Sequence, residues 1–232
     1  MSFTQNCPVC GGADFAQLDV LWPALIDAWE LSEVETNYVN RQQGFHCKSC
    51  GNNLRAMGIG QAILNCYEAD GPLSDVPKSI DKLDVLEINR AGSLTSTLAL
   101  LQKHRLIEFP EFDMQKLDIP TESYDLVLHS DTLEHVEDPV LALSECRRIL
   151  KVGGRCIYSV PIIVDRLNRS RAGLSKSFHG QSGIDADDQQ VWTEFGADAW
   201  KTVIKAGFES CEIYAFEFPA SLVLIARKRQ RK

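Results

Sequence analysis

The sequence predicts an α/β fold built on a parallel sheet, and a strand–helix–strand unit in its second half is the main reason. Residues 124–128 form a short, mainly apolar run, as in a strand buried on both faces of a parallel sheet. Asp138 and Pro139 then open a helix, the aspartate as N-cap and the proline at the first helical position. Gly153-Gly154 can end that helix because glycine readily adopts a positive φ. Residues 156–160 follow as the next strand.

Polar side chains gather just beyond the first of these strands, and they are His129, Ser130, Asp131, Glu134 and His135. Open α/β sheets bind their ligands at the carboxyl ends of their strands. We therefore expect a ligand site at this end of the sheet.

Length, composition and charge limit the class of protein. A chain of 232 residues holds one full α/β domain and a small module. With 44% hydrophobic and 24% charged residues, the composition is that of a folded globular protein. The sequence shows neither a signal-peptide pattern nor an apolar run of about 18 residues, so we expect a cytoplasmic protein without a membrane partner. The net charge of -8 argues against an extended nucleic-acid surface.

Four of the eight cysteines form two Cys-x-x-Cys-Gly pairs, Cys7 with Cys10 and Cys47 with Cys50. Two such knuckles can supply the four thiolates of a closed, structural zinc site. The intervening residues 11–46 exceed the roughly 15–20 residues of compact zinc modules, so an insertion must be accommodated. A pair of disulfides fits poorly with a cytoplasmic chain, and a redox dithiol needs only one knuckle. We expect a zinc-ribbon-like module.

The remaining elements follow from periodicity and composition. Apolar residues recur at helical spacing in residues 23–31 of the insertion, and again in residues 54–67, after the second knuckle. Residues 71–77 are a loop by composition, which places the boundary between a zinc-ribbon-like module with its connecting helix, residues 1–70, and a main domain, residues 78–232. The main domain should begin with a strand at 83–88, a helix at 93–103 and a strand at 105–109. It should end with a helix at 193–206 and a hairpin of residues 209–216 and 221–226.

Four consecutive segments, residues 113–117, 123–128, 133–138 and 148–154, resemble the motifs of the class I S-adenosylmethionine-dependent methyltransferases, in particular the type 11 group. The resemblance covers roughly residues 81–161. It implies a Rossmann-like, seven-stranded sheet with an antiparallel last strand, and S-adenosylmethionine as cofactor.

The resemblance also implies a cofactor site. Glu87 should end the first strand, and a loop through Asn89, Ala91 and Gly92 should approach the methionine part of the cofactor, although only Gly92 is a glycine. Glu108, at the end of the second strand, should accept hydrogen bonds from the ribose hydroxyls, and Asp113, which heads the next motif, should meet the adenine amino group. The resemblance also implies Met114, His129 and Ser130 as cofactor-binding residues.

Methyl transfer needs a base only when the acceptor is a hydroxyl group. Candidate bases are His129, Asp131 and His179. The polar segment around His179 suits either a lid over the acceptor or a surface loop.

Three functions remain open from the sequence. The first is methylation of a small molecule or a glycan, in a pocket that the zinc module helps to shape. The second is methylation of RNA, for which the arginines of residues 166–171 would bind phosphate. The third is a non-catalytic binding protein that has kept the fold. The sequence leaves the acceptor and the oligomeric state open.

Overall fold

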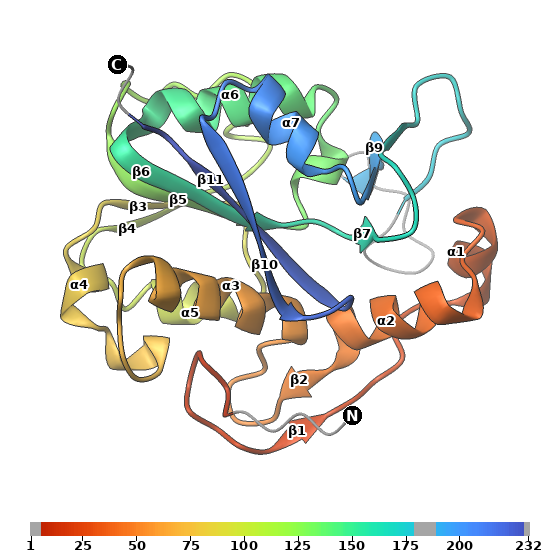
Figure 1. Ribbon diagram of the computed structural model, residues 1–232, viewed down its shortest axis with the longest axis horizontal. Helices are drawn as coiled ribbons and strands as arrows, with labels where there is room; N and C mark the ends of the chain where they lie inside the picture. The colour runs from red at the N-terminus through yellow and green to blue at the C-terminus, as the bar shows by residue number, and fades with distance from the viewer. Residues whose placement is uncertain (1–5, 179–188, 230–232) are drawn as a thin grey trace.

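A mixed sheet with helices on both faces carries the main domain, as Figure 1 shows for the computed structural model. The structure describes residues 6–178 and 189–229. The strand order is β10-β11-β6-β5-β3-β4. Strands β6, β5, β3 and β4 are parallel to one another, and β11 runs antiparallel to β6, which confirms the Rossmann-like sheet with an antiparallel last strand. The bounds are β3 (Val85–Ile88), β4 (His104–Ile107), β5 (Tyr124–Ser130), β6 (Leu150–Ser159), β10 (Ser210–Glu217) and β11 (Ser221–Arg227).

Each face of the sheet buries its own apolar core. One face packs against α6 (Pro139–Ile149) and α7 (Trp200–Lys205), and the other against α3 (Leu54–Cys66), α4 (Lys78–Asp81) and α5 (Leu94–Leu98). Side chains alternate between the two cores along β5, with Leu126 and Leu128 on the α3 side and Val127 on the α6 side. Among the described residues, no helix is long and apolar enough to span a bilayer.

The main sheet differs from the expected seven strands, because the described residues form only six. Residues 108–123, between β4 and β5, contain no helix or strand. A parallel crossover of this length usually contains an α-helix. The chain here returns to the sheet through a turn-rich segment, which leaves β4 as the edge strand.

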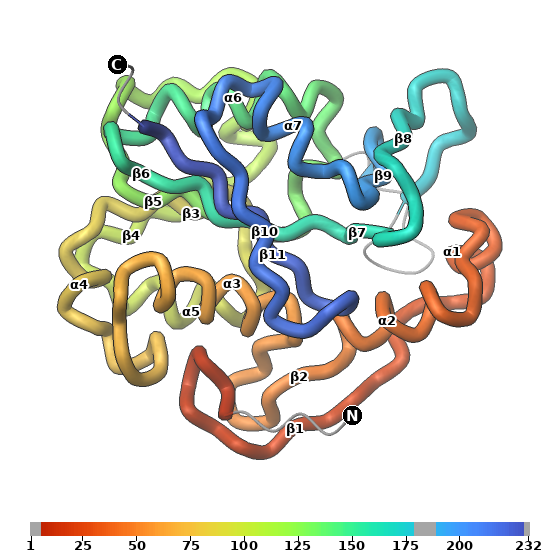
Figure 2. Tube along the Cα trace, in the orientation of Figure 1, coloured from red at the N-terminus to blue at the C-terminus, as the bar shows by residue number. Residues whose placement is uncertain are grey.

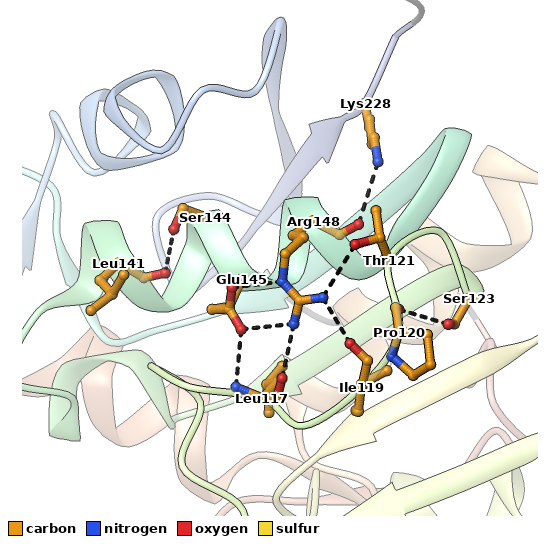
Figure 3. Close-up of polar contacts among 10 residues, drawn as sticks. All are labelled: Leu117, Ile119, Pro120, Thr121, Ser123, Leu141, Ser144, Glu145, Arg148 and Lys228. Atoms are coloured by element: carbon orange, nitrogen blue, oxygen red, sulfur yellow. Dashed lines mark hydrogen bonds and ion pairs between the residues drawn. The ribbon is translucent and has the colours of Figure 1, made fainter.

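Arg148 on α6 holds this crossover in place (Figure 3). Its guanidinium donates hydrogen bonds to the carbonyl oxygens of Leu117 at 2.9 Å and Ile119 at 2.7 Å. Glu145 accepts from the same guanidinium at 2.8 Å and from the Leu117 amide at 3.0 Å. These contacts supply partners for backbone groups that have no secondary structure of their own.

The N-terminal segment forms a small module beneath α3. Figure 2 shows the chain leaving β1, running out to α1 and α2, and returning to β2. Its elements are β1 (Phe15–Ala16), α1 (Pro23–Ala28), α2 (Glu33–Gly44) and β2 (His46–Cys47), and β1 pairs with β2 in antiparallel fashion.

Two glycines of α3 allow close packing on both sides of this helix. A Cβ on Gly58 would lie 2.4 Å from the Ser221 hydroxyl of β11, and one on Gly60 would lie 2.9 Å from a methyl group of Val9. The first knuckle, α3 and the sheet consequently share one core. The division into residues 1–70 and 78–232 stays a prediction.

Several expected elements are confirmed, namely the helix after the second knuckle, the helix start at Asp138 and the final hairpin. Asp138 accepts hydrogen bonds from the amides of Val140 and Leu141 at 3.0 and 2.9 Å, as an N-cap should. Helix α6 nevertheless ends at Ile149, before the Gly153-Gly154 pair, because β6 already begins at Leu150.

The expected helix at 193–206 is wrong in its first third. Residues Thr193–Gly196 form β9, which pairs with β7 (Ile162–Ile163) and β8 (Arg169–Ser170), and α7 follows. The backbone of Arg166 lies so close to Gly196 that a Cβ there would meet its carbonyl oxygen at 2.2 Å. Sequence periodicity does not reveal such tertiary pairing.

Helix α2 was not expected, although its start carries a local signal. The Ser32 hydroxyl accepts from the Glu35 amide at 3.3 Å, and the Glu35 carboxylate accepts from the Ser32 amide at 2.8 Å. This is a capping box, which a Ser-x-x-Glu pattern predicts. The remaining short elements are η1 (Leu73–Asp75) and η2 (Leu133–His135).

Candidate functional site

A cavity of about 550 Å³ lies at the carboxyl ends of β3, β4 and β5. This is the edge at which open α/β sheets bind ligands, and the volume is in the range of small-molecule sites. Five of the residues expected from the sequence line it, namely Asn89, Glu108, Asp113, Met114 and Asp131.

The carboxylate of Glu87 faces the loop after β3 and is fully buried. One oxygen accepts from the Ala91 amide at 2.8 Å and from the Thr95 hydroxyl at 2.5 Å. The other lies 2.8 Å from Nε2 of His104 on the neighbouring strand. Glu87 therefore fixes the shape of the loop without lining the cavity, whereas Asn89 within the loop does line it.

Asn89 gives that loop the backbone angle that a glycine would otherwise supply. Its φ is 56°, and its side-chain oxygen accepts from the Phe109 amide at 2.9 Å. Asparagine tolerates this left-handed region better than most residues. Gly92 has a φ of 60° and open space around its Cα, and it does not line the cavity.

The two acidic residues of the crossover have different partners. Glu108 forms an ion pair with Arg90, with Nε and Oε1 3.1 Å apart, and both side chains are exposed to solvent. Asp113 accepts from the Gln115 amide at 2.8 Å. Met114 beside it is 4% exposed and lines the cavity with an apolar surface.

His129 and Ser130 point to opposite faces of β5, and the cavity lining includes neither. The His129 ring is fully buried and stacks on Tyr158, with centroids 4.5 Å apart. Burial lowers the pKa of His129 to about 3, so the ring is neutral at physiological pH. Ser130 lies 3.0 Å from the Ser159 hydroxyl on β6.

Asp131 has a φ of 45°, and residues from outside the matched motifs hold its carboxylate. Arg55 on α3 forms an ion pair with Oδ2, and the Gln43 amide of α2 donates to the same oxygen at 2.8 Å. Burial lowers the pKa of Arg55 to about 10. The third candidate base, His179, lies outside the described residues.

The cavity has further lining residues that sequence reasoning did not assign to it. One of them is His135, which belongs to the motif at residues 133–138 and was already noted among the polar residues that follow the strand at 124–128. Of the others, Gln115 lies within the motif at residues 113–117 and Thr132 follows β5, whereas no motif marked the residues from the irregular crossover and from the segment before β9: Phe109, Phe112 and Trp192.

The four N-terminal cysteines form a second site beneath α3. Their sulfur atoms all lie within 4.8 Å of one another, with Cys7 and Cys50 3.7 Å apart and Cys10 and Cys47 3.6 Å apart. Tetrahedral zinc with bonds of about 2.3 Å requires sulfur separations of about 3.8 Å. The donor set therefore fits a closed zinc site.

Each knuckle turns at the glycine that follows its second cysteine. Gly11 and Gly51 have φ values of 75° and 73°, and their amides donate to the carbonyl oxygens of Cys7 and Cys47 at 2.7 and 2.8 Å. A residue with a Cβ is strained at this φ, so the Cys-x-x-Cys-Gly pattern has a direct backbone cause.

Known proteins resemble this chain most clearly in its central part. Residues 83–158 match the family model described as a methyltransferase domain, type 11. A ubiquinone biosynthesis O-methyltransferase of Cereibacter sphaeroides is 32% identical over 98 residues, which are 42% of this chain and 35% of the relative. One from Nitrosospira multiformis is 26% identical over 141 residues, which are 56% of this chain and 50% of the relative. The chain thus spans half or less of the length of these curated relatives.

Among solved structures, an S-adenosylmethionine-dependent methyltransferase of Thermotoga maritima is 17% identical. The match covers 64% of this chain and 83% of that one, with a TM-score of 0.40. Residues 83–158 of this chain thus match the type 11 methyltransferase-domain family, and a four-cysteine cluster lies near the N-terminus.

Proposed function

We propose that this protein is an S-adenosylmethionine-dependent methyltransferase that methylates a hydroxyl group of a small molecule, and that its cysteine cluster holds a structural zinc ion. The observation that carries the proposal is the cavity at the carboxyl ends of β3, β4 and β5, with Asn89, Glu108, Asp113 and Met114 in its lining. The family match and the name of the curated relatives, O-methyltransferases, support the same reaction class.

The residues of the cavity fit the parts of the cofactor. Asp113 can accept a hydrogen bond from the adenine amino group while Met114 packs on the ring. Glu108 can accept the ribose hydroxyls once Arg90 releases it, and an exposed ion pair of this kind is worth only about 0–1 kcal/mol. The positive φ of Asn89 lets backbone approach the methionine part closely.

When bound, the cofactor supplies an activated methyl group. The protein must then align the acceptor oxygen, exclude water and accept the hydroxyl proton. Asp131 is the titratable candidate that lines the cavity, whereas His129 lies within the core.

Two of the three arginines suspected of binding RNA are engaged within the protein, whereas Arg169 is exposed and its guanidinium lies 3.9 Å from Glu194. Arg166 donates to the Glu35 carboxylate at 2.7 Å and to the carbonyl oxygens of Trp29 and Glu30 at 2.8 and 2.6 Å. Arg171 pairs with Glu194 and donates to a further carbonyl oxygen. These contacts favour a small acceptor over RNA.

Calorimetric titration of the zinc-loaded protein with S-adenosylmethionine and S-adenosylhomocysteine tests the proposal. We expect micromolar binding of both, a loss of at least tenfold in Asp113→Ala, and no change in Asp118→Ala, which alters an exposed aspartate outside the cavity. Absence of binding to either ligand would contradict the proposal and favour a non-catalytic binding protein.

A further inference from the structure

The second cysteine knuckle lies against the loop that follows β3. A Cβ placed on Gly51 would lie 3.0 Å from the hydroxyl oxygen of Ser93 and 3.7 Å from its Cβ. Gly51 follows Cys50, the last cysteine of the cluster, and Ser93 joins the loop to the first turn of α5. The candidate zinc site and the candidate cofactor site are therefore joined by a direct contact.

We propose that this contact couples the two sites, so that the zinc-loaded knuckle holds the loop in its binding conformation and metal and cofactor bind cooperatively. Gly51 and Ser93 are the positioning residues. The inference rests on the proposed function. It adds that the metal site acts on the affinity for the cofactor, beyond its effect on the stability of the N-terminal module.

The backbone of the knuckle at Gly51 is set by the same turn that brings the cysteines together. The Gly51 amide donates to the carbonyl oxygen of Cys47 at 2.8 Å, and the Cys47 amide donates to the carbonyl oxygen of Asn52 at 2.9 Å. Gly51 has no side chain and a φ of 73°, which leaves room for the Ser93 side chain. A knuckle that opens on loss of the metal moves the surface against which Ser93 rests.

The two segments also share a buried layer beneath this surface contact. Ala91 of the loop and Leu94 of α5 belong to the same apolar core as Cys47 and Leu54. Helix α3, which begins just after the second knuckle, contacts α5, and the two lie side by side on one face of the sheet (Figure 1). Because such interiors are close-packed, displacement of one segment displaces its neighbour.

The loop is held at three points between β3 and α5. The side-chain oxygen of Asn89 accepts from the Phe109 amide at 2.9 Å, and the Ala91 amide donates to Glu87 at 2.8 Å. The contact of Ser93 with the knuckle is the third. Asn89 lines the cofactor cavity, so the conformation of the loop reaches the ligand through it. A loop that is less often in its binding conformation lowers the apparent affinity by the same fraction.

The first knuckle supplies a matched comparison. Gly11 has a φ of 75°, and its amide donates to the carbonyl oxygen of Cys7 at 2.7 Å, so its turn has the geometry of the turn at Gly51. A Cβ on Gly11 would have Cγ of Pro72 as its nearest neighbour, at 3.7 Å, which is ordinary contact. Alanine strains both knuckles alike, but only at Gly51 does it press on the loop.

Calorimetric titration of the full-length protein with S-adenosylhomocysteine, in saturating zinc, tests the inference. We expect Gly51→Ala to weaken binding by about fivefold or more and Gly11→Ala by less than about twofold. Elemental analysis should find one zinc ion per chain in both. Adding Ser93→Ala should remove most of the effect of Gly51→Ala, because the new Cβ then meets only the Cβ of residue 93, at 3.7 Å.

The wild type provides a second measurement that needs no variant to fold. Coupling between two ligands is reciprocal, so S-adenosylhomocysteine must tighten zinc binding by the same factor by which zinc tightens S-adenosylhomocysteine binding. Competition with a chelator of known zinc affinity measures this. We expect saturating S-adenosylhomocysteine to lower the zinc dissociation constant by about fivefold or more.

The outcomes separate the inference from the proposed function. Zinc-loaded wild type that binds no S-adenosylhomocysteine would contradict the proposed function and, with it, the coupling. Normal S-adenosylhomocysteine binding with equal losses in Gly51→Ala and Gly11→Ala would overturn the coupling alone, because the effect would then come from the stability of the whole module. A zinc affinity that S-adenosylhomocysteine leaves unchanged would also overturn it.

Discussion

The Arg166 guanidinium and the Glu35 carboxylate form a bidentate ion pair, with Nε to Oε1 at 2.7 Å and Nη2 to Oε2 at 2.8 Å. Arg166 follows β7 in the main domain, while Glu35 lies in the first turn of α2 in the N-terminal insertion. Hydrogen bonding to Arg166 lowers the pKa of Glu35 to about 2, so the pair is charged at neutral pH. It fastens α2 to the segment that follows β7.

Removing this contact should destabilise the protein. We expect Glu35→Gln to lower the free energy of unfolding by about 2 kcal/mol, because Arg166 loses a charged hydrogen-bond partner at a largely buried position. Glu33→Gln, an exposed glutamate in the same turn, should change it by less than about 0.5 kcal/mol. Urea unfolding at pH 7 measures both variants. An equally small loss of unfolding free energy in Glu35→Gln and Glu33→Gln would show that the Arg166–Glu35 ion pair contributes little to stability.

The crossover depends on the fork geometry of Arg148. Arg148→Lys keeps the positive charge but cannot bind Glu145 and two carbonyl oxygens together, so we expect a loss of about 1–3 kcal/mol in unfolding free energy. The affinity for S-adenosylhomocysteine should also fall, because the crossover carries Asp113. Arg147 lies on the same helix as Arg148 and forms an ion pair with Glu209 outside that helix, so Arg147→Lys should leave the affinity for S-adenosylhomocysteine unchanged. Calorimetry on the two variants decides this point.

The Arg90–Glu108 ion pair should compete with the ribose for one carboxylate. Arg90→Gln frees Glu108, and we expect S-adenosylhomocysteine to bind equally or up to about fivefold more tightly, since an exposed pair is worth about 0–1 kcal/mol. Glu108→Gln should weaken binding. Tighter binding by Glu108→Gln than by the wild type would contradict the assignment of Glu108 to the ribose.

The cysteine cluster should hold one zinc ion per chain. Elemental analysis of the purified protein should find it in the wild type and in Cys211→Ser, which changes a cysteine outside the cluster, but not in Cys47→Ser. Chelation should also lower the stability of the main domain, because the first knuckle packs against α3. Full zinc content in Cys47→Ser would exclude the four-thiolate site.

The buried His129 should make stability depend on pH. Its pKa is lowered from 6.5 to about 3 in the folded state, so the unfolded chain takes up the proton first. Stability is therefore highest above about pH 6.5 and falls as the pH drops below that value. We expect wild type to lose about 1 kcal/mol relative to His129→Phe between pH 7 and pH 5.5, since phenylalanine keeps the ring on Tyr158 without titrating. Parallel pH profiles of the two proteins would show that folding does not lower the pKa of His129.

Local signals in the sequence were reliable where one or two residues determine the backbone. Asp138 with Pro139 starts α6, and Gly11 and Gly51 close the two knuckles. The Ser32 to Glu35 capping box would have revealed α2 by the same logic. Signals of this kind act within one turn of chain, so they do not depend on what packs nearby.

The sequence by itself determined the fold class, the edge of the sheet that carries the cavity, and the four cysteines that come together. These follow from hydrophobic patterning, from the direction of parallel strands and from short metal-binding spacings. Only the tertiary structure decided that residues 193–196 form β9, that the main sheet of the described residues has six strands, and that Arg55 and Gln43 contact Asp131, which lines the cavity. Such contacts join elements far apart along the chain. They depend on close packing of whole side chains, which no local pattern of residues encodes.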